Sequence, residues 1–407
     1  MSLKSHRRPS VMMLGTFGLR PKATLRARAL GIAVSLSQRW DFALTTTPWD
    51  HPADRGKRVV ELGVPILNTR AASPLLFPLA VREMTRESTR LESELIHLFK
   101  PKGFGDLAAR RLSRRLSVVV DMDDWEGDGG WNELGAYGPL QRRLFDWQER
   151  TWPRRAAAVT VASHELHDRA LSLGAREEAV FYVPNGLTRN HFHAITNARR
   201  DLVPAQIRTA VQSRHVVLLY TRFVEFSPLA VVHVIQGIRK RIPDAVLLVV
   251  GASADGRSEA EIQRNLSDRG AHDSVVFSGW TEPESIPSLL QLGNVAIHPF
   301  DDNLVNRSKC SVKLLELMAS GVPVVTNRVG ENASMIEDGN SGSLVPPNDV
   351  DAMVRQASEL LADDSRAQRI GIEAQRRVAN HFLWEHLALT VEFAYEYALK
   401  RTSPTNG

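Results

Sequence analysis

Short runs of apolar residues alternate along the chain with amphipathic segments of helical length. In the first half these runs are SVMMLG, DFALTTT, VPILNT, SELIHLF, SVVVDM, AAVTVAS and AVFYVPN. Brief apolar runs separated by helical patterns are typical of strands in a parallel sheet, with each helix crossing from one strand to the next. The pattern therefore predicts an α/β fold.

The same alternation begins again in the second half, with the runs HVVLLY, AVLLVVG, SVVFSGW, NVAIHPF and PVVTN. Helical segments between them are expected to end at Gly270 and Gly321, where a left-handed residue is favoured. The periodicity is lost over residues 191–206, which we interpret as a linker. The predicted organisation has three parts: an N-terminal domain over 1–195, a C-terminal domain over 206–380, and an apolar helical tail over 381–407 that packs across both domains.

Length and composition agree with two domains in a reducing compartment. A chain of 407 residues exceeds one ordinary hydrophobic core. Its single cysteine, Cys310, excludes a disulfide framework and a cysteine-based zinc cluster, so a cytoplasmic location is expected. His164 and His167 lie one helical turn apart without a third ligand, and we expect no metal site. We interpret the apolar stretch near the N-terminus as the first strand, because it is too brief for a convincing signal peptide or a membrane span.

The net charge of +5 raises the question of an anionic partner. Basic residues concentrate in the first third of the chain: Lys4, His6, Arg7, Arg8, Arg20, Lys22, Arg26, Arg28, Arg110, Arg111, Arg114 and Arg115. They include no zinc-finger spacing and no aromatic-rich RNA-binding strand. A solvated surface or peripheral contact with anionic lipid headgroups is therefore favoured over nucleic acid.

Candidate chemistry follows the strands of the second half. Arg222 comes directly after HVVLLY, and Lys313 and Glu316 come after NVAIHPF. Ligands of open α/β sheets bind at the carboxyl ends of strands. There an arginine can hold two phosphate oxygens, a lysine adds a point charge, and a carboxylate can accept from two ribose hydroxyls. The pattern predicts a nucleotide-diphosphate site, with a structural Arg222–Glu225 ion pair and a solvated Glu316 as the alternatives.

Longer stretches of the second half resemble a known family. HPFDDNLVNRSKCSVKLLELMASGVPVVTN and the following GENASMIEDGNSGSLVPPND are similar to the donor-binding segment of retaining glycosyltransferases of the GT-B fold, family 4. VASHELHDRALSLGA and YVPNGL add to the resemblance. It implies two Rossmann-like domains with parallel sheets facing a central cleft, and a C-terminal helix that returns to the N-terminal domain. The implied reaction moves a hexosyl unit from a nucleotide-sugar to a hydroxyl acceptor, with retention and without a metal or other cofactor.

The resemblance also implies roles for individual residues. Glu316 would bind the donor ribose, while Arg222 and Lys313 would hold the diphosphate and stabilise it as the leaving group. The full implied donor-binding set is Gly15, Arg222, Ser308, Lys309, Ser311, Lys313 and Glu316. An ordinary turn is the alternative for Gly15.

The sequence departs from the family pattern at three places. Ser308 stands where the family often has a second glutamate that touches a sugar hydroxyl. Phe226 and Ser227 stand where a phosphate-binding lysine commonly follows the arginine, and Asp123 takes the place of a histidine in the N-terminal domain. Arg222, Lys309 and Lys313 are then left to carry the diphosphate.

An acidic loop, VVVDMDDWEGDGGW, follows a strand of the first half. Its carboxylates could bind a divalent cation, form hydrogen bonds to sugar hydroxyls, or cap the next helix. We expect Asp123 to contact the transferred sugar or the acceptor as a catalytic group, and Asp124 to lie on the acceptor side. Mutual repulsion in such a cluster can raise the pKa of one aspartate. Lys100 and Lys102 follow another strand, and they either face the acceptor or form a basic turn.

Two other functions remain open at this stage. A sugar-nucleotide 2-epimerase could use the same scaffold, and it would need a compact set of carboxylates and histidines around the sugar. A non-catalytic protein that binds nucleotide-sugars would need only the nucleotide pocket. The sequence leaves the base, the sugar and the acceptor undetermined.

Overall fold

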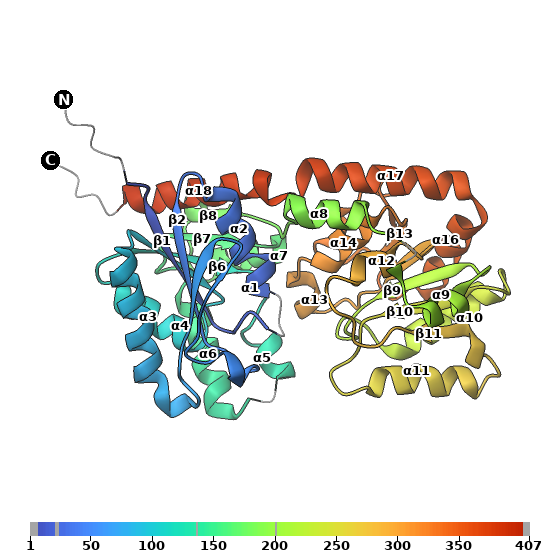
Figure 1. Ribbon diagram of the computed structural model, residues 1–407, viewed down its shortest axis with the longest axis horizontal. Coiled ribbons are helices and arrows are strands. Elements are labelled where there is room, and N and C mark those ends of the chain that lie inside the picture. Colours follow the sequence, from blue (N-terminus) through green and yellow to red (C-terminus); the bar gives the residue numbers. More distant parts are fainter. Residues whose placement is uncertain (1–6, 21–23, 136, 200–201, 402–407) are drawn as a thin grey trace. The chain divides into compact units, whose positions relative to one another are not determined.

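The computed structural model describes residues 7–20, 24–135, 137–199 and 202–401 (Figure 1). Two compact units divide the chain. Unit 1 contains residues 1–188, 308–310 and 384–407, and unit 2 contains residues 189–307 and 311–383. Lys4, His6 and Lys22, which contribute to the basic N-terminal region, lie outside the described residues.

Unit 1 is built on an eight-stranded sheet in the order β3-β4-β2-β1-β5-β6-β7-β8. Its strands are β1 (Ser10–Gly15), β2 (Asp41–Thr46), β3 (Arg58–Glu61), β4 (Val64–Asn68), β5 (Leu95–Phe99), β6 (Ser117–Met122), β7 (Ala158–Val161) and β8 (Val180–Tyr182). The neighbours pair in parallel except β3 and β4, which form an antiparallel hairpin. The hydrophobic pattern predicted seven of these strands but not β3, because the side chains of this edge strand are mostly exposed.

Unit 2 has a six-stranded parallel sheet in the order β11-β10-β9-β12-β13-β14. Its strands are β9 (Val216–Tyr220), β10 (Val246–Val250), β11 (Val275–Phe277), β12 (Val295–His298), β13 (Val324–Asn327) and β14 (Ser343–Val345). Strand order reverses direction at β9, next to β12, so the carboxyl end of β9 is the position at which such sheets bind ligands. The predicted α/β class is confirmed in both units.

Helices connect the strands of each sheet. In unit 1 they are α1 (Thr24–Ala27), α2 (Ala29–Leu36), α3 (Phe77–Leu91), α4 (Gly103–Leu112), α5 (Trp131–Leu134), α6 (Pro139–Thr151), α7 (His164–Ser172) and α18 (Trp384–Lys400). In unit 2 they are α8 (Arg189–Thr196), α9 (Ala205–Val211), α10 (Pro228–Arg239), α11 (Arg257–Ser267), α12 (Ile286–Leu290), α13 (Leu304–Ser308), α14 (Val312–Ser320), α15 (Asn332–Met335), α16 (Val350–Ala362) and α17 (Asp364–His381). Gly321 (φ 75°) and Gly270 (φ 69°) are left-handed, as predicted for helix ends.

Residues 191–206, predicted as a linker, contain most of helix α8. The helix was missed because it buries only one apolar side chain, that of Ile195. The apolar tail also differs from one continuous helix: α17 ends at His381, and α18 begins at Trp384. α18 belongs to unit 1, and α17 belongs to unit 2.

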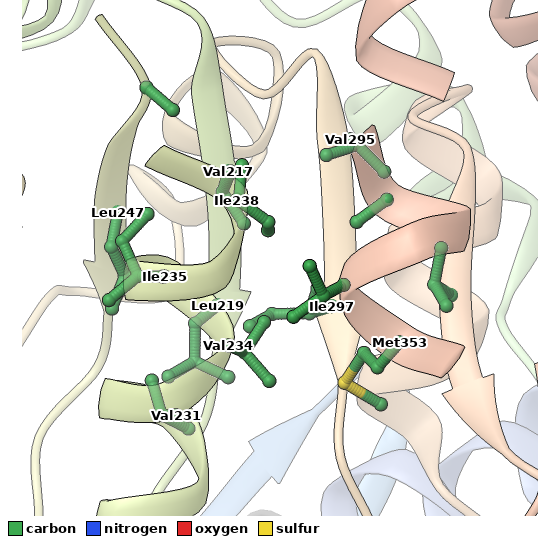
Figure 2. Close-up of a cluster of buried hydrophobic side chains, with 14 of the residues drawn as sticks. Val217, Leu219, Val231, Val234, Ile235, Ile238, Leu247, Val295, Ile297 and Met353 are labelled. Carbon is green, nitrogen blue, oxygen red and sulfur yellow. The ribbon is translucent and has the colours of Figure 1, made fainter. Parts of the chain in front are cut away.

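The core of unit 2 lies where α10 and α16 cover the sheet (Figure 2). Val217 and Leu219 of β9 are fully buried against the apolar face of α10, which includes Ile235 and Ile238. Every side chain of β9 is buried, as expected for a strand covered by helices on both faces. This packing fixes the end of β9, and with it the residues that follow.

Unit 1 buries a comparable core, into which α18 packs. Trp384, at the start of α18, is fully buried, and a Cβ atom at Gly31 of α2 would come within 2.3 Å of its indole ring. A glycine is therefore required for α2 and α18 to approach this closely. Tyr395, one of the buried aromatic residues of α18, reaches the polar network of β5 and β6 described below.

Candidate active site

The carboxyl end of β9 gathers the predicted donor-binding residues of unit 2. Tyr220, the last residue of β9, is buried, and its hydroxyl lies close to the Glu316 carboxylate. Burial and the negative charge of Glu316 raise the pKa of Tyr220 well above its usual range, while the nearby charge of Arg222 lowers it. Lys313 Nζ lies 5.7 Å from the centroid of the Tyr220 ring. Tyr220 is thus the common neighbour of Arg222, Lys313 and Glu316.

Arg222 is exposed beyond the end of β9. The alternative of an ion pair with Glu225 is not realised between these two described residues. Glu225 is buried, and one of its oxygens accepts the backbone N–H of Val224 at 3.3 Å. The Arg222 guanidinium is therefore available to an anionic ligand.

Glu316 lies on α14, and its side chain is 12% exposed, so it is not on a solvated helix face. Its Oε1 lies 2.7 Å from Nε2 of His191, a residue of α8. This contact orients the carboxylate, and Tyr220 lies close to it. Neither His191 nor Tyr220 was predicted as a site residue, because His191 is far from Glu316 in the sequence and lies in the segment predicted as a linker.

The polar loop before α14 divides into residues with different surroundings. Ser311 is the N-cap of α14, and its Oγ accepts the backbone N–H of Leu314 at 3.3 Å. Ser308 is fully buried, and its hydroxyl has no hydrogen-bond partner in the described part of the chain. Lys309 Nζ lies 5.3 Å from the centroid of the Trp131 ring, within unit 1. The capping role accounts for Ser311 without a ligand.

Cys310 explains why this short segment belongs to unit 1. Its sulfur accepts the backbone N–H of Asn185 at 3.2 Å, and its carbonyl accepts the Asn185 side-chain amide at 2.8 Å. Asn185 lies after β8, in the YVPNGL stretch that contributes to the family resemblance. The buried cysteine therefore has a structural role between two loops.

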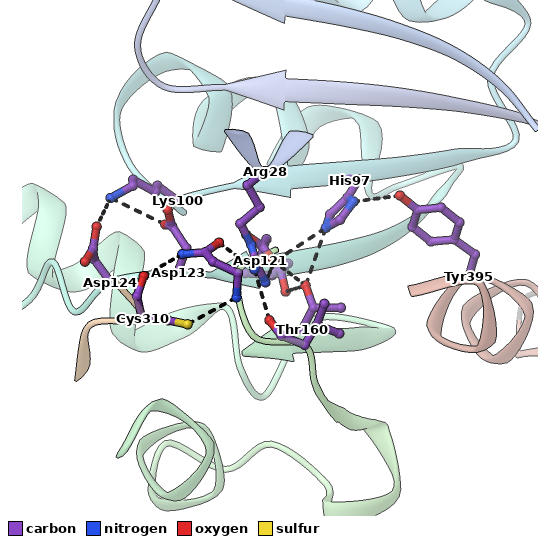
Figure 3. Close-up of polar contacts among 12 residues, drawn as sticks. Arg28, His97, Lys100, Asp121, Asp123, Asp124, Thr160, Cys310 and Tyr395 are labelled. Atoms are coloured by element: carbon purple, nitrogen blue, oxygen red, sulfur yellow. Dashed lines mark hydrogen bonds and ion pairs between the residues drawn. The ribbon is translucent and has the colours of Figure 1, made fainter. Parts of the chain in front are cut away.

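The acidic loop after β6 pairs with the basic turn after β5, a contact that the sequence did not predict (Figure 3). Lys100 Nζ donates to Asp124 at 2.6 Å and to Glu126 at 3.0 Å. Lys102 Nζ donates to Glu126 at 2.9 Å and to Asn132. Burial alone would raise the pKa of Glu126, but the charges of the two lysines outweigh it and lower the pKa to about 2. The lysines thus neutralise the acidic loop from within unit 1.

Asp123 is the exception in this cluster. It is 4% exposed, and Lys100 Nζ lies 3.4 Å from its Oδ1. This oxygen nevertheless has no hydrogen-bond partner among the described residues. Burial, opposed by Lys100 and reinforced by Asp124 and Asp121, raises the pKa of Asp123 to about 7. The expected raised pKa in the acidic loop therefore belongs to Asp123, which lines a small pocket with Thr16 and Lys100.

A buried network holds the end of β6 beneath Asp123. Arg28 makes a bidentate ion pair with Asp121, with Nε–Oδ2 and Nη2–Oδ1 distances of 2.6 and 2.8 Å (Figure 3). Burial lowers the pKa of His97 to about 4, so its ring is neutral at pH 7. Nδ1 of His97 lies 2.8 Å from the hydroxyl of Tyr395. These contacts give Asp121 a structural role near the carboxyl end of β6.

Gly15 ends β1 next to Leu25. A Cβ atom at this position would lie 2.4 Å from Leu25 Cδ1, so a larger residue would require the Leu25 side chain to move. The next residue, Thr16, donates from its hydroxyl to the carbonyl oxygens of the basic turn, including Lys100 at 2.8 Å. The end of β1 therefore fixes the turn that carries Lys100 and Lys102.

Within the described ranges, no group of three or more histidine, cysteine, aspartate or glutamate side chains has the arrangement of a metal site. None of the helices in the part of the chain that the structure describes is long and apolar enough to span a membrane.

The fold and the relatives described below define a glycosyltransferase of the GT-B architecture, which passes a sugar from a nucleotide-sugar donor to a hydroxyl acceptor. The particular family follows from two family models. "Glycosyl transferases group 1" matches residues 214–363, and "Glycosyl transferase 4-like domain" matches residues 24–186. The chain belongs to this group 1 family of glycosyltransferases.

Individual relatives agree with this assignment. The chain is 28% identical over 283 residues to the GDP-mannose-dependent alpha-(1-6)-phosphatidylinositol monomannoside mannosyltransferase of Mycolicibacterium smegmatis, covering 69% of each chain. It is 26% identical over 236 residues to the alpha-D-kanosaminyltransferase of Streptomyces kanamyceticus, covering 57% of this chain and 58% of that protein. The family is thus shared with enzymes named for different sugars.

Solved structures share the fold. Sucrose-phosphate synthase from Thermosynechococcus elongatus gives a TM-score of 0.73 at 19% identity, covering 97% of this chain and all of that one. Anabaena HepE in complex with UDP gives a TM-score of 0.69 at 17% identity, covering 95% and 99% of the two chains. The predicted GT-B fold is confirmed.

Proposed function

We propose that this enzyme transfers a hexosyl unit with retention of configuration at the anomeric carbon and without a metal ion. The observation that carries the proposal is the grouping of Arg222, Lys313 and Glu316 around Tyr220. At the end of a central strand, two cations suit the phosphates of a nucleoside diphosphate, and one carboxylate suits its ribose. Glu316 would accept hydrogen bonds from the ribose hydroxyls, and Arg222 and Lys313 would bind the phosphates.

The same cations supply the proposed catalysis. As the bond from the anomeric carbon to the phosphate oxygen breaks, negative charge grows on the diphosphate, where Arg222 and Lys313 would stabilise it. The acceptor oxygen forms the new bond to the anomeric carbon. Its proton passes to the departing phosphate, which balances the reaction without a protein nucleophile.

Asp123 is our candidate for a catalytic group in unit 1. Its Oδ1, which has no hydrogen-bond partner among the described residues, can accept a hydrogen bond from a hydroxyl of the sugar or of the acceptor. Asp124, Lys100 and Lys102 are engaged with one another and with Glu126. We therefore propose that these three position the Asp123 loop on the acceptor side.

His191 and Tyr220 would act as positioning residues. His191 contacts the Glu316 carboxylate, and Tyr220 lies close to it. The carboxylate keeps acceptor sites for a ligand, because its two oxygens can accept about four hydrogen bonds. The ribose hydroxyls could therefore bind while these contacts persist.

Localisation is part of the same proposal. The enzyme would work in the cytoplasm, in peripheral contact with the inner face of the membrane. Its positive net charge supports this location, since anionic lipids attract basic surfaces.

Product formation tests the proposed function. Purified enzyme would first be screened by thermal shift with GDP-mannose and UDP-glucose, because a ligand specific to the folded state raises Tm. Labelled donor and a hydroxyl acceptor would then be supplied, and the anomeric configuration of the product determined by NMR. An epimerised sugar without transfer would instead indicate a 2-epimerase, and binding without turnover would indicate a non-catalytic protein.

Glu316→Ala is expected to weaken donor binding about ten- to a hundredfold, since hydrogen bonds to a charged acceptor contribute roughly 1.5–3 kcal/mol. Isothermal titration with the donor would measure the change. Glu373→Ala is the matched control, because Glu373 is a half-buried glutamate of α17 in the same unit. Unchanged donor affinity in Glu316→Ala would exclude the ribose role.

Chelation tests the metal-free mechanism. Activity is expected to remain within about twofold after EDTA treatment, because the Asp124 and Glu126 carboxylates are already paired with lysine ammonium groups. The measurement is the initial rate with and without chelator. Loss of activity that magnesium or manganese restores would contradict the prediction.

A further inference from the structure

Helix α6 of unit 1 exposes an apolar stripe that its own fold does not cover. Leu140, Leu144 and Trp147 recur at helical spacing and are 80%, 42% and 47% exposed. The neighbouring face of α6, with Phe145 and Gln148, is buried. An amphipathic helix of a globular protein normally buries its apolar stripe, so this stripe needs a partner outside the unit.

The exposed charged side chains on the three helices α3, α4 and α6 have one sign, and acidic side chains such as Asp128 and Glu133 lie in the adjoining loop and helix. On α3, α4 and α6, every exposed charged side chain is an arginine: Arg82, Arg86, Arg90, Arg111, Arg142, Arg143 and Arg150. The acidic side chains of these helices are buried or half-buried. Four of them form ion pairs with arginines, namely Glu83, Glu87, Asp106 and Asp146. The surface formed by α3, α4 and α6 is therefore cationic.

The three helices form one continuous surface. α3 packs on α4, and α4 packs on α6. Between α4 and α6, the Arg110 guanidinium lies 4.0 Å from the centroid of the Trp147 ring and donates to Thr151 at 2.6 Å. Figure 1 shows α3, α4 and α6 together in unit 1.

A second exposed apolar group lies where α3 begins. Leu75, Leu76 and Phe77, at the start of α3, are 87%, 40% and 47% exposed. α3 and α6 follow β4 and β6, which run in the same direction as their parallel neighbours. Crossover helices of a parallel sheet begin near the carboxyl ends of its strands. The apolar residues at the starts of α3 and α6 are therefore expected at one edge.

From this arrangement we infer that the α3–α4–α6 surface docks on an anionic lipid membrane. Leucine, phenylalanine and tryptophan side chains can enter the boundary between headgroups and acyl chains, while arginines bind lipid phosphates. A polyanion such as nucleic acid would match the charge but would leave the leucines uncovered. The inference extends the proposed peripheral location to a particular surface and does not depend on the identity of the donor.

Vesicle co-sedimentation of the full chain tests the inference. We expect binding to phosphatidylcholine vesicles that contain phosphatidylglycerol, and at least tenfold weaker binding to pure phosphatidylcholine. The double variant Arg142→Gln/Arg143→Gln should bind the anionic vesicles about 30-fold more weakly, at about 1 kcal/mol per arginine. Arg257→Gln/Arg369→Gln, which removes two exposed arginines from helices of unit 2, is the matched control and should bind as wild type.

The apolar contribution has its own variant. Leu140→Ser/Leu144→Ser should weaken binding at least about tenfold, including at high salt, where charge is screened. Leu389→Ser of α18 should not. Equal binding of wild type and both surface variants would overturn the inference, as would a dimer that these variants dissociate or binding to polynucleotide instead of vesicles. Transfer to a water-soluble acceptor, measured in parallel, should be unchanged in the variants, so failure of the membrane role remains distinct from failure of the proposed reaction.

Discussion

Arg222→Ala is expected to lower kcat by about 10²–10³, the range found when a charge-stabilising donor is removed from an active site. Donor affinity should fall much less. The reason is that the diphosphate gains negative charge as the glycosidic bond breaks, so a cation stabilises the transition state more than the bound donor. Phe226 and Ser227 follow in place of a lysine, so no neighbouring cation in that loop can compensate.

Steady-state kinetics and donor titration would separate the two effects. Arg222→Lys should recover part of kcat, because the charge remains while the bidentate geometry is lost. Arg257→Ala, an exposed arginine of α11 in the same unit, is the matched control and should leave kcat unchanged. Because Arg222 is exposed, its replacement should not unfold the protein, and unfolding would not explain a large loss of kcat. Turnover within a few-fold of wild type would refute a catalytic role.

Asp123→Asn is expected to reduce turnover by about 10²-fold, in the range of a lost general acid–base contribution, while nucleotide affinity stays nearly constant. Asn keeps the size of the side chain but cannot ionise, and Asp123 belongs to unit 1, whereas Arg222 and Glu316 belong to unit 2. Asp124→Asn is the comparison, because Asp124 already pairs with Lys100. Full activity of Asp123→Asn would leave Asp123 with a structural role only.

The stability of wild type relative to Asp123→Asn should depend on pH in a defined direction. The folded-state pKa of Asp123 is raised to about 7, above the unfolded value of about 4. The folded state therefore binds the Asp123 proton more tightly than the unfolded state does. The resulting contribution to folding stability is fully present below about pH 4 and is lost as pH rises to about 7. Over this window, wild type should lose up to about 1.4 kcal/mol per pH unit relative to Asp123→Asn.

Denaturant unfolding of both proteins between pH 4 and 8 would measure this difference. Because the other titratable groups are common to both proteins, their contributions cancel. The free energy of unfolding of Asp123→Asn should rise relative to that of wild type between about pH 4 and 7, and the difference should be constant above about pH 7. A constant difference at every pH would show that Asp123 is ionised throughout.

Several features of the fold could be predicted from sequence because their causes are local. Runs such as HVVLLY and AVLLVVG are apolar at every position, since helices cover both faces of a parallel sheet. The hydrophobic pattern failed where burial is slight, as in β3 and α8. The motif from Lys313 to Glu316 could also be recognised, because both residues lie on one helix at fixed spacing.

The neighbours of these residues could not be predicted in the same way. His191 and Tyr220 reach Glu316 from α8 and β9, and no spacing in the sequence specifies those contacts. Lys100 and Asp124 each suggested a ligand when considered alone. Their mutual ion pair depends on β5 and β6 being adjacent in the sheet.

The sequence by itself determined the α/β class, most of the strands and the chemical types at the end of β9, because periodicity and side-chain chemistry are properties of short segments. Only the tertiary structure decided which charges are neutralised and which remain available. Lys100 and Lys102 pair with the acidic loop, whereas Arg222 stays exposed and Asp123 keeps a buried oxygen without a hydrogen bond among the described residues. The physical reason is that burial and Coulomb interactions depend on distances between strands, and strand order fixes those distances only after folding.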